Sequence, residues 1–236
     1  MAVSRVSGGL ITAGLIVLMA GCGSGGQGAV APPQSGATLQ SPAPSSGAGS
    51  PTSGRENREP ATVKGLVAAV LTHLDPDRVK GKGGGGSEDG GSMSVHIDVE
   101  VSGAVVPLEV VAAAYGGDMG RPSEAELCPK DPAVLRCTTW AQDDGSFVVR
   151  LTATEDLTGG ILDKGLVAYV MHMREDEGVI VMQTVPDRQP DYVDMTRLPL
   201  DVTVLEQIAT DPLVGTSTSP ELNRVGEGLE GIFGPE

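Results

Sequence analysis

Aromatic and basic residues are scarce in this chain. Aromatic side chains make up 3% of its 236 residues, and 16 Lys and Arg stand against 31 Asp and Glu, so the formal net charge is −15 at pH 7. A surface of this charge repels nucleic acids and anionic lipid headgroups, and so few rings disfavour the stacking of bases or sugars. The composition therefore excludes a role in binding polyanions.

Sequence signatures of common catalytic sites are absent as well. The chain contains no GxSxG nucleophile elbow, no HExxH zinc motif and no GxxxxGKS/T phosphate loop. Its 31 acidic residues make any pair of carboxylates uninformative about glycoside hydrolysis. We therefore expect no catalytic site, no cofactor and no bound metal. A hydrolase without a recognisable motif is the third-ranked alternative.

Cysteine occurs three times, and the copies divide into a single residue and a pair. Cys128 and Cys137 lie close in the sequence, with Pro129 and Pro132 between them and no histidine nearby. Their spacing is not the CxxC of a redox dithiol or a zinc site. We predict a structural disulfide, which would contribute about 2.5–3 kcal/mol at most because its loop is short. A metal-binding pair and a redox dithiol are the alternatives.

An apolar run stands near the N-terminus. It extends from Leu10 to Ala20, downstream of Arg5, and has the length of a signal-peptide core rather than of a membrane span. Its end, Ala20-Gly21-Cys22, resembles the lipobox of bacterial lipoproteins, with Met19 where leucine is commoner. The resemblance implies cleavage before Cys22, a diacylglycerol on its sulfur and acylation of the new N-terminus.

Two acyl chains would hold the protein on a membrane, because each buried methylene contributes about 0.8 kcal/mol. We therefore expect the protein at the cell membrane, anchored by lipid on the extracytoplasmic face. The alternative is a plain secretory signal with an incidental cysteine at position 22.

Composition predicts four segments. Residues 1–21 are the lipoprotein signal peptide, and residues 22–58 are the lipidated Cys22 and a Gly/Ser/Pro-rich linker, which has too few large apolar residues to fold. Residues 59–212 form an extracytoplasmic α+β domain, and residues 213–236 form a C-terminal tail. The linker would act as a tether that holds the domain away from the membrane.

The domain begins with a helical pattern, in which apolar residues recur at three- and four-residue spacing. They are Val63, Leu66, Val67, Val70, Leu71 and Leu74. Asp75-Pro76 ends this helix, because a proline disfavours helical geometry in the residue before it. Residues Lys80–Ser92, with the glycine run Gly83–Gly86, are expected to form a mobile loop. Glu88 and Asp89 in this loop supply too few ligands for calcium.

Alternating apolar and polar residues then predict strands and hairpins. The chain turns at Asp143-Asp144-Gly145 and again at Arg174–Gly178, two acidic segments that we interpret as solubilising turns. After the first turn, Phe147 and Val149 should face in, whereas Arg150 and Thr152 should face out. The expected strands are Met93–Val101, Val105–Tyr115, Leu135–Gln142, Ser146–Thr154, Leu166–Met173 and Val179–Val185.

A second helix is predicted near the C-terminus. Thr203 and Glu206 have the spacing of a capping box, and Asp211-Pro212 ends the helix. A last, weak helix follows Ser219-Pro220, where glycines such as Gly226 lower the helix propensity. The fold class is therefore α+β: a mostly antiparallel sheet of about six strands packed on a long N-terminal helix, plus a short C-terminal helix.

Four local patterns carry a family resemblance. They are the helix end Leu71–Asp77 before a glycine loop, the pair Cys128 and Cys137-Thr138, the Asp-Gly hairpin that follows, and Leu205–Pro212. Together they resemble a family of uncharacterised lipoproteins and membrane-anchored exoproteins from Streptomyces and its relatives. The likeness spans roughly residues 60–212. It implies a fold and a location, and it assigns no active site.

Histidine and tryptophan are the remaining candidate site residues. We expect His73, at the end of the first helix, and His96, on the polar side of its strand, to be solvated. We expect Trp140, next to the Cys137 strand, to pack against the disulfide rather than stack on a ligand.

Met171-His172-Met173 faces Met182 across a hairpin, and thioethers with an imidazole would suit Cu(I). However, the histidine points away from the methionine side of the strand. We therefore interpret the methionines as core residues.

These patterns lead to a ranking of functions. The first hypothesis is a non-enzymatic, lipid-anchored binding or sensory protein, or an accessory subunit of another envelope protein. The second is a binder of a small ligand or of copper, through the Gly83–Gly86 loop or the methionine hairpin. The expected partners are the membrane, through Cys22, and an envelope protein, but not nucleic acid.

Overall fold

The computed structural model describes residues 57–86, 91–115, 120–155, 162, 164–230 and 232–233. The helices are α1 (Val63–Leu71), α2 (Glu124–Leu127), α3 (Pro190–Val193), α4 (Val202–Thr210) and α5 (Pro220–Glu227), and a 3-10 turn spans Pro76–Arg78. The strands are β1 (Glu59–Pro60), β2 (Val79–Gly86), β3 (Ser92–Val101), β4 (Ala104–Ala114), β5 (Val134–Ala141), β6 (Phe147–Ala153), β7 (Leu166–Met173), β8 (Glu177–Val185), β9 (Ser217–Thr218) and β10 (Ile232–Phe233).

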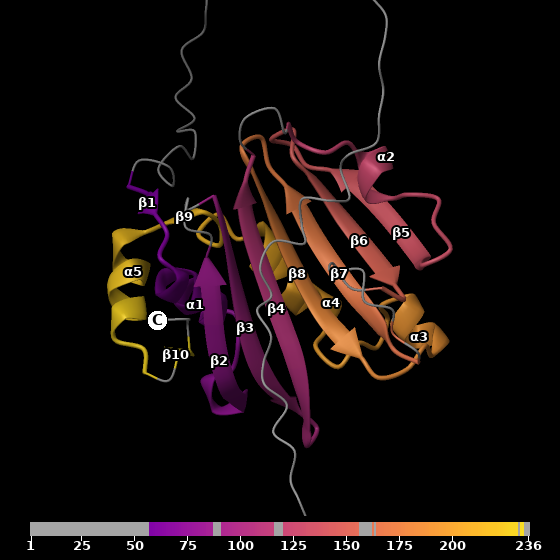
Figure 1. Ribbon diagram of the computed structural model, residues 1–236, viewed down its shortest axis with the longest axis horizontal. Coiled ribbons are helices and arrows are strands. Elements are labelled where there is room, and N and C mark those ends of the chain that lie inside the picture. Colours follow the sequence, from indigo (N-terminus) through magenta and orange to yellow (C-terminus); the bar gives the residue numbers. More distant parts are fainter. Residues whose placement is uncertain are drawn as a thin grey trace, which may run out of the picture. The chain divides into compact units, whose positions relative to one another are not determined.

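Eight strands form the main sheet, in the order β10-β2-β3-β4-β8-β7-β6-β5. β10 runs parallel to β2, and all other neighbouring pairs in this sheet are antiparallel. Figure 1 shows the sheet as a twisted layer that runs from β2 to β5, with α4 behind it. The α+β class and the mostly antiparallel sheet are confirmed. The expected number of strands was too low, because β2 and β10 join the six that were predicted.

The glycine-rich segment Val79–Gly86 is strand β2 instead of the mobile loop expected there. It pairs with β3, and Gly84 lies against α1. A Cβ atom at Gly84 would stand 2.6 Å from Cγ1 of Val63 and 2.8 Å from the carbonyl oxygen of Ser94, which is too close for any side chain. The glycines therefore let the helix approach the strand. Glu88 and Asp89, which we judged too few to hold calcium, lie outside the described residues.

Helix α1 is shorter than its apolar stripe suggests. Thr62 is its N-cap, and its hydroxyl accepts a hydrogen bond from the Gly65 N–H at 2.9 Å. Beyond Leu71 the backbone tightens into a 3-10-type turn, because the Leu74 N–H donates to the Leu71 carbonyl at 3.2 Å. Leu74 is still buried. The predicted apolar stripe is thus correct, but the helix proper has nine residues.

Helices cover one face of the sheet. α1 contacts β2 and β3, α4 contacts β7 and β8, and α5 packs on α1 (Figure 1). The core between these helices and the sheet includes Leu66, Val70, Ile97, Leu108, Val170, Val181, Leu205 and Ile208. None of the helices in the described part of the chain is long and apolar enough to cross a bilayer.

A second apolar cluster lies on the opposite face of the sheet. Its members include Phe147, Val149, Leu151, Tyr169, Met171, Met173 and Met182, and the α2 segment packs on it through Leu127 and Cys128. The predicted inward side of β6 is therefore confirmed. Its other side was expected to face solvent, yet Thr152 is fully buried and Arg150 pairs with Glu206 of α4. β6 is covered on both faces, which the alternation of its residues does not reveal.

Residues 213–230, which we expected to form a tail, contain β9 and α5. β9 pairs with β1, and α5 packs on α1. The two helices cross closely, because a Cβ atom at Gly226 would lie 2.6 Å from the backbone nitrogen of Gly65. Asn223 of α5 accepts a hydrogen bond from the Thr62 N–H at 3.0 Å. Tertiary contacts therefore support a helix whose own propensity is low.

Helix α4 starts with a different cap from the predicted one. Asp201 is the N-cap, and its carboxylate accepts a hydrogen bond from the Thr203 N–H at 2.8 Å. Glu206 was expected to complete a capping box with Thr203, but it reaches the sheet and pairs with Arg150. A tertiary ion pair has replaced the local hydrogen bond.

Candidate functional site

A buried polar network surrounds the β7–β8 turn, where α4 ends. Arg174 donates to Glu177 Oε1 at 2.5 Å, to the Val214 carbonyl at 2.9 Å and to the Asp211 carbonyl at 2.6 Å. The guanidinium therefore joins the turn to the backbone that follows α4. Such charge-assisted bonds are stronger than neutral ones.

Glu177 is the anion of this network. Its carboxylate accepts hydrogen bonds from the Thr216 N–H at 2.6 Å and the Thr216 hydroxyl at 2.7 Å, and the Arg58 guanidinium lies 3.9 Å away. Burial raises the pKa of Glu177, but the Thr216 hydrogen bonds and the Arg174 charge outweigh it and hold that pKa below its ordinary value. The interpretation of this segment as a solubilising turn is therefore wrong for Glu177, which is 4% exposed.

His172 extends the network toward the first hairpin. Its Nε2 lies 2.8 Å from the Ser146 hydroxyl, and its Nδ1 lies 3.2 Å from the Ala209 carbonyl. Burial, followed by the charge of Arg174, lowers the pKa of His172 below its ordinary value. In the neutral ring, Nε2 donates to the Ser146 hydroxyl, and Nδ1 accepts a hydrogen bond from Nε of Arg174 at 3.3 Å. His172 thus joins the first hairpin to the Arg174 network.

Ser146 and His172 are adjacent but are not arranged for nucleophilic catalysis. The single proton of the serine hydroxyl is donated to Asp144 Oδ1 at 2.6 Å. The hydroxyl therefore receives a bond from the histidine instead of giving one. Both residues are buried, with exposed fractions of 4% and 6%. This arrangement is the reverse of a serine activated by a histidine base.

The methionine prediction is confirmed. Met171, Met173 and Met182 are buried together on the face of the sheet that α2 covers. His172 lies on the other face, against the end of α4. The Met173 sulfur accepts a hydrogen bond from the Tyr115 hydroxyl at 3.0 Å.

The other two histidines differ from each other. His96 is exposed and lies 3.1 Å from Asp98, so its predicted solvation is confirmed. His73 was expected to be solvated too, but its Nε2 lies 2.7 Å from Asp211 Oδ2 and its side chain is 19% exposed. The pair joins the end of α1 to the end of α4, a long-range contact that a helix-end pattern does not show.

Cys128 and Cys137 form a disulfide, with their Cα atoms 5.7 Å apart. It ties the α2 segment to β5 on the methionine side of the sheet. Trp140 was expected to pack on this disulfide, but it packs on the helix-covered side, under the Arg150 guanidinium at 5.1 Å. The reason is the period of the strand: positions 137 and 140 differ by an odd number and face opposite ways.

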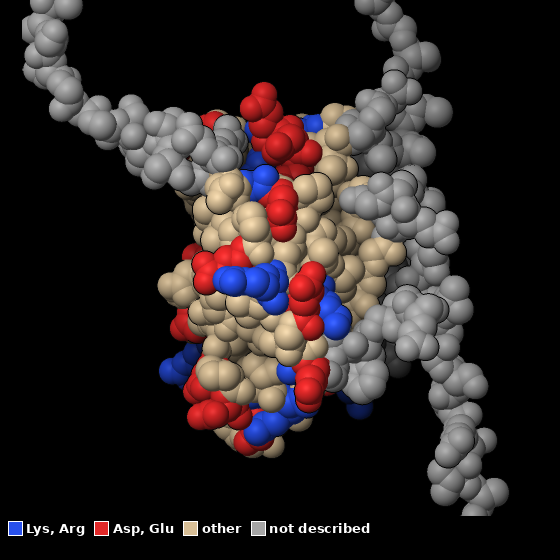
Figure 2. Space-filling view, turned by 90° about the vertical axis from the view of Figure 1, so that its left-hand side faces the viewer, with Lys and Arg blue, Asp and Glu red and all other residues tan. Residues whose placement is uncertain are grey.

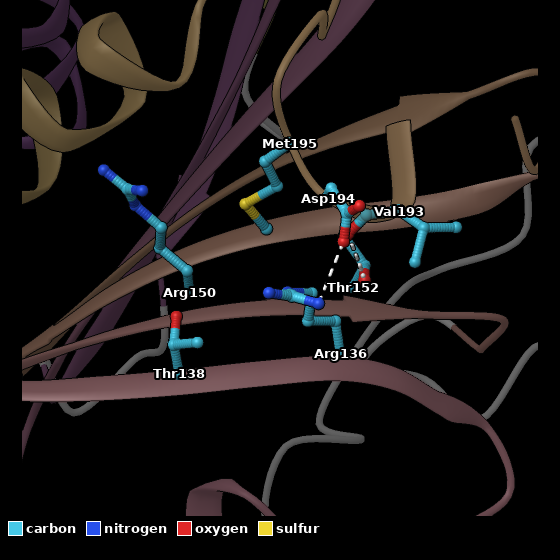
Figure 3. A pocket seen from close by; sticks show the side chains of 7 residues that line it. All are labelled: Arg136, Thr138, Arg150, Thr152, Val193, Asp194 and Met195. Atoms are coloured by element: carbon cyan, nitrogen blue, oxygen red, sulfur yellow. Dashed lines mark hydrogen bonds and ion pairs between the residues drawn. The ribbon is translucent and has the colours of Figure 1, made fainter. Parts of the chain in front are cut away.

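A pocket of about 120 Å³ opens beside Arg150, at the edge of the sheet. Side chains of β5 and β6 form one wall, and the segment at the end of α3 forms the other (Figure 3). The lining residues are Arg136, Thr138, Arg150, Thr152, Val193, Asp194 and Met195. In the register of the hairpin, Arg136 is opposite Thr152 and Thr138 is opposite Arg150. Four polar side chains therefore form a square on one face of two strands.

Two ion pairs and a hydrogen bond organise this pocket. Arg136 lies 3.0 Å from Asp194, and their side chains are 59% and 49% exposed. Arg150 donates from both Nε and NH2 to the same oxygen of Glu206, each at 2.5 Å. The buried Thr152 hydroxyl donates to the Val193 carbonyl at 3.1 Å and holds the two walls together.

Met195 has an uncommon backbone at the rim of the pocket, with φ of 55°. Its N–H donates to the Tyr192 carbonyl, and the Thr196 N–H donates to the Asp191 carbonyl, so α3 ends in a Schellman motif. Glycine is the usual residue at this position, because a side chain in the left-handed region is strained. Met195 nevertheless has a buried side chain that lines the pocket and belongs to the core.

The two arginines of the pocket distinguish it from the rest of an acidic chain. Figure 2 shows acidic and basic side chains next to one another on the side of the molecule that carries α5. Two arginines in one pocket are unusual in a chain with twice as many acidic as basic residues. The sequence contained a signal for this pocket: positions 136 and 138, and likewise 150 and 152, are polar at two-residue spacing.

The structure does not bring the sequence-predicted candidates into one site. The disulfide and the methionines share one face of the sheet, whereas His172 lies on the other face. Cys22 lies outside the described residues. No group of three His, Cys, Asp or Glu within the described ranges could hold a metal ion. The pocket and the buried network were both missed, since each depends on contacts between distant segments.

No protein family, curated protein or solved structure matches this chain.

Proposed function

We propose that the protein is a lipid-anchored extracytoplasmic binding or accessory protein that presents its domain to a partner in the cell envelope. The observation that carries this proposal is the sequence Ala20-Gly21-Cys22 at the end of an apolar run of signal-peptide length. A Gly/Ser/Pro-rich linker and a folded domain follow it. Lipid on Cys22 would keep the domain at the membrane surface, while the linker would set its reach.

The way the chain enters the domain supports this role. Arg58 donates to the Ser217 carbonyl at 2.6 Å, and the Glu59 carboxylate accepts from the Asn223 side chain at 2.7 Å. The first described strand, β1, pairs with β9. The linker therefore joins the domain at a well-anchored point, from which a tether can hold the domain without loosening its fold.

A small-ligand binder is the second candidate, and the pocket beside Arg150 favours it. Two arginines and two threonines line this pocket, which has a volume of about 120 Å³. The copper version of this candidate is disfavoured, because His172 lies on the opposite face of the sheet from Met171 and Met173. An enzyme ranks third, since the proton of Ser146 is committed to Asp144.

Replacing the anchoring cysteine tests the proposal directly. Cys22→Ala should move the protein from the membrane fraction to the culture medium, because the thioether can no longer form. Ser35→Ala, in the linker, is the control and should leave the protein in the membrane fraction. The readout is immunoblotting of both fractions, with mass spectrometry of the N-terminal peptide for the lipid. Retention of Cys22→Ala in the membrane would contradict the anchor.

Native mass spectrometry of the protein extracted from its own membrane separates the two leading candidates. A second polypeptide bound to it would identify an accessory subunit. A small, constant added mass beyond the lipid would instead identify a ligand binder and would show which ligand to study.

A further inference from the structure

We propose that the pocket between the β5–β6 hairpin and α3 binds one small oxyanion group, a carboxylate or a phosphate, of a soluble ligand. This inference rests on the binding role proposed above and names the chemistry of its ligand. It is carried by the two arginines, Arg136 and Arg150, and by the strained residue Met195 that closes the pocket.

The size of the pocket selects a single group. The pocket measures about 120 Å³. Sites for whole ligands usually measure about 300–1,000 Å³. A carboxylate or a phosphate fits the smaller space. Because β5 is at the edge of the sheet, the rest of the ligand can extend into solvent.

Arg150 is a preorganised donor. The Trp140 ring lies 5.1 Å from its guanidinium, and Glu206 takes its Nε and NH2 groups with a single oxygen. A guanidinium has five N–H donors. The N–H donors of Arg150 that Glu206 does not engage are held in place by the Trp140 ring and by the ion pair. An entering anion would therefore not have to order this side chain.

Arg136 is an exchangeable donor. Its pair with Asp194 is more than half exposed on the arginine side, and exposed pairs contribute only about 0–1 kcal/mol. A ligand oxyanion can therefore replace the Asp194 carboxylate at little cost and gain a two-pronged contact with the guanidinium. Thr138, directly opposite Arg150 in the hairpin register, adds a hydroxyl donor on the same face.

The strained backbone of Met195 fixes the position of the end of α3, which forms the pocket wall opposite the arginines. This backbone lies at a φ of 55°, where a non-glycine residue is strained, and the Met195 side chain is 6% exposed. The buried methionine side chain holds the end of α3 against the core, which places Asp194 and the Val193 carbonyl at the mouth of the pocket.

Tryptophan fluorescence can test this proposal, since Trp140 is the sole tryptophan and lies under Arg150. The full mature chain with Cys22→Ala is titrated with inorganic phosphate and, separately, with acetate, at constant ionic strength balanced with chloride. We expect a saturable change in emission with at least one of the two anions. Saturation by phosphate alone assigns a phosphate group, and saturation by acetate alone assigns a carboxylate.

A matched pair of variants separates local recognition from overall charge. Arg136→Gln should weaken the affinity about 10-fold or more, and Arg136→Lys should weaken it less, because a lysine keeps the charge but loses the fork. Arg197→Gln removes the same charge from an exposed pair with Asp191 on the same turn. This control should change the affinity less than about 2-fold, within the range of weak exposed pairs.

Two outcomes would overturn the proposal: no saturable response to either anion, or equal losses in Arg136→Gln and Arg197→Gln. Neither outcome bears on the anchor, which is tested by the location of Cys22→Ala. Conversely, membrane retention of Cys22→Ala together with saturable anion binding would remove the anchor and leave the pocket assignment in place.

Discussion

Glu177 is a carboxylate in the core, and the groups around it explain how the fold tolerates it. Burying an unpaired charge is very unfavourable, but this one has the Arg174 guanidinium at 2.5 Å and two hydrogen bonds from Thr216. Gly215 gives it room, because a Cβ atom there would lie 2.5 Å from Glu177 Oε1. The network is satisfied as a whole, so the loss of one member should affect all of them.

Glu177→Gln should lower the free energy of unfolding by about 3–5 kcal/mol at pH 7, since it leaves buried guanidinium charge uncompensated. The measurement is chemical denaturation at neutral pH. Glu175→Gln is the matched control: Glu175 is exposed in the same turn, and its replacement should change the free energy by less than about 0.5 kcal/mol. Equal effects of the two substitutions would show that the network contributes nothing specific.

The same residue predicts a dependence on pH. The folded state holds the pKa of Glu177 below its ordinary value of 4.5. A lowered pKa contributes stability above the ordinary value, and this contribution is lost as the pH falls through the lowered pKa. The stability difference between the wild type and Glu177→Gln should therefore be largest at neutral pH and should shrink below pH 4.5. A difference that grew on acidification would contradict this sign.

At the scale of elements, glycines decide how closely α1 approaches its neighbours. Gly84 of β2 lies under Val63 of α1, and Gly226 of α5 faces the backbone of α1 at Gly65. Local propensity disfavours glycine in both strands and helices. Glycine at these two positions is explained by the close packing of α1 against β2 and α5, which only the full fold produces.

Gly226→Ala should destabilise the domain by about 1–3 kcal/mol, because a methyl group would overlap the α1 backbone and force the helices apart. Gly228→Ala, at the C-cap of the same helix, is the control. A Cβ atom there would meet only the Val225 carbonyl oxygen, at 3.5 Å. Thermal unfolding followed by circular dichroism compares the two. If Gly226→Ala melted at the wild-type temperature, the described helix crossing would be incorrect.

Periodicity predicted the elements well where one face of a strand or helix is buried. The stripe of α1, the Asp-Gly hairpin and the inward side of β6 were all predicted, because burial of one face imposes its period on the residues. β2 was missed, since glycine has no side chain to alternate. The outer side of β6 was misassigned because its polar residues, Arg150 and Thr152, can face either solvent or a covering segment.

At the scale of the whole molecule, the two ends of the domain meet. β1 pairs with β9, α5 packs on α1, and β10 adds to the edge of the main sheet beside β2. The last part of the chain therefore covers its first helix. This arrangement makes the segment after Pro212 part of the fold rather than an appendage.

A chain that ends at Pro212 should lose most of its cooperative unfolding transition, because α1 would lose the helix that covers it and β1 would lose its partner. Circular dichroism and calorimetry would measure this. Val225→Ser is the control on α5, since Val225 is 49% exposed, and it should leave the transition nearly unchanged. A truncated chain that unfolds with the wild-type midpoint would show that residues 213–230 are dispensable.

The sequence by itself determined the α+β class, the antiparallel hairpins and the apolar faces, and it predicts a lipid anchor at Cys22. These properties depend on neighbours within a few residues, so a local pattern encodes them. Tertiary structure alone decided that β2 is a strand, that Glu177 and His172 are buried, and that Arg136 and Arg150 line one pocket with Met195. Each depends on which distant segments the topology brings into contact, and a contact between distant residues leaves no period in the sequence.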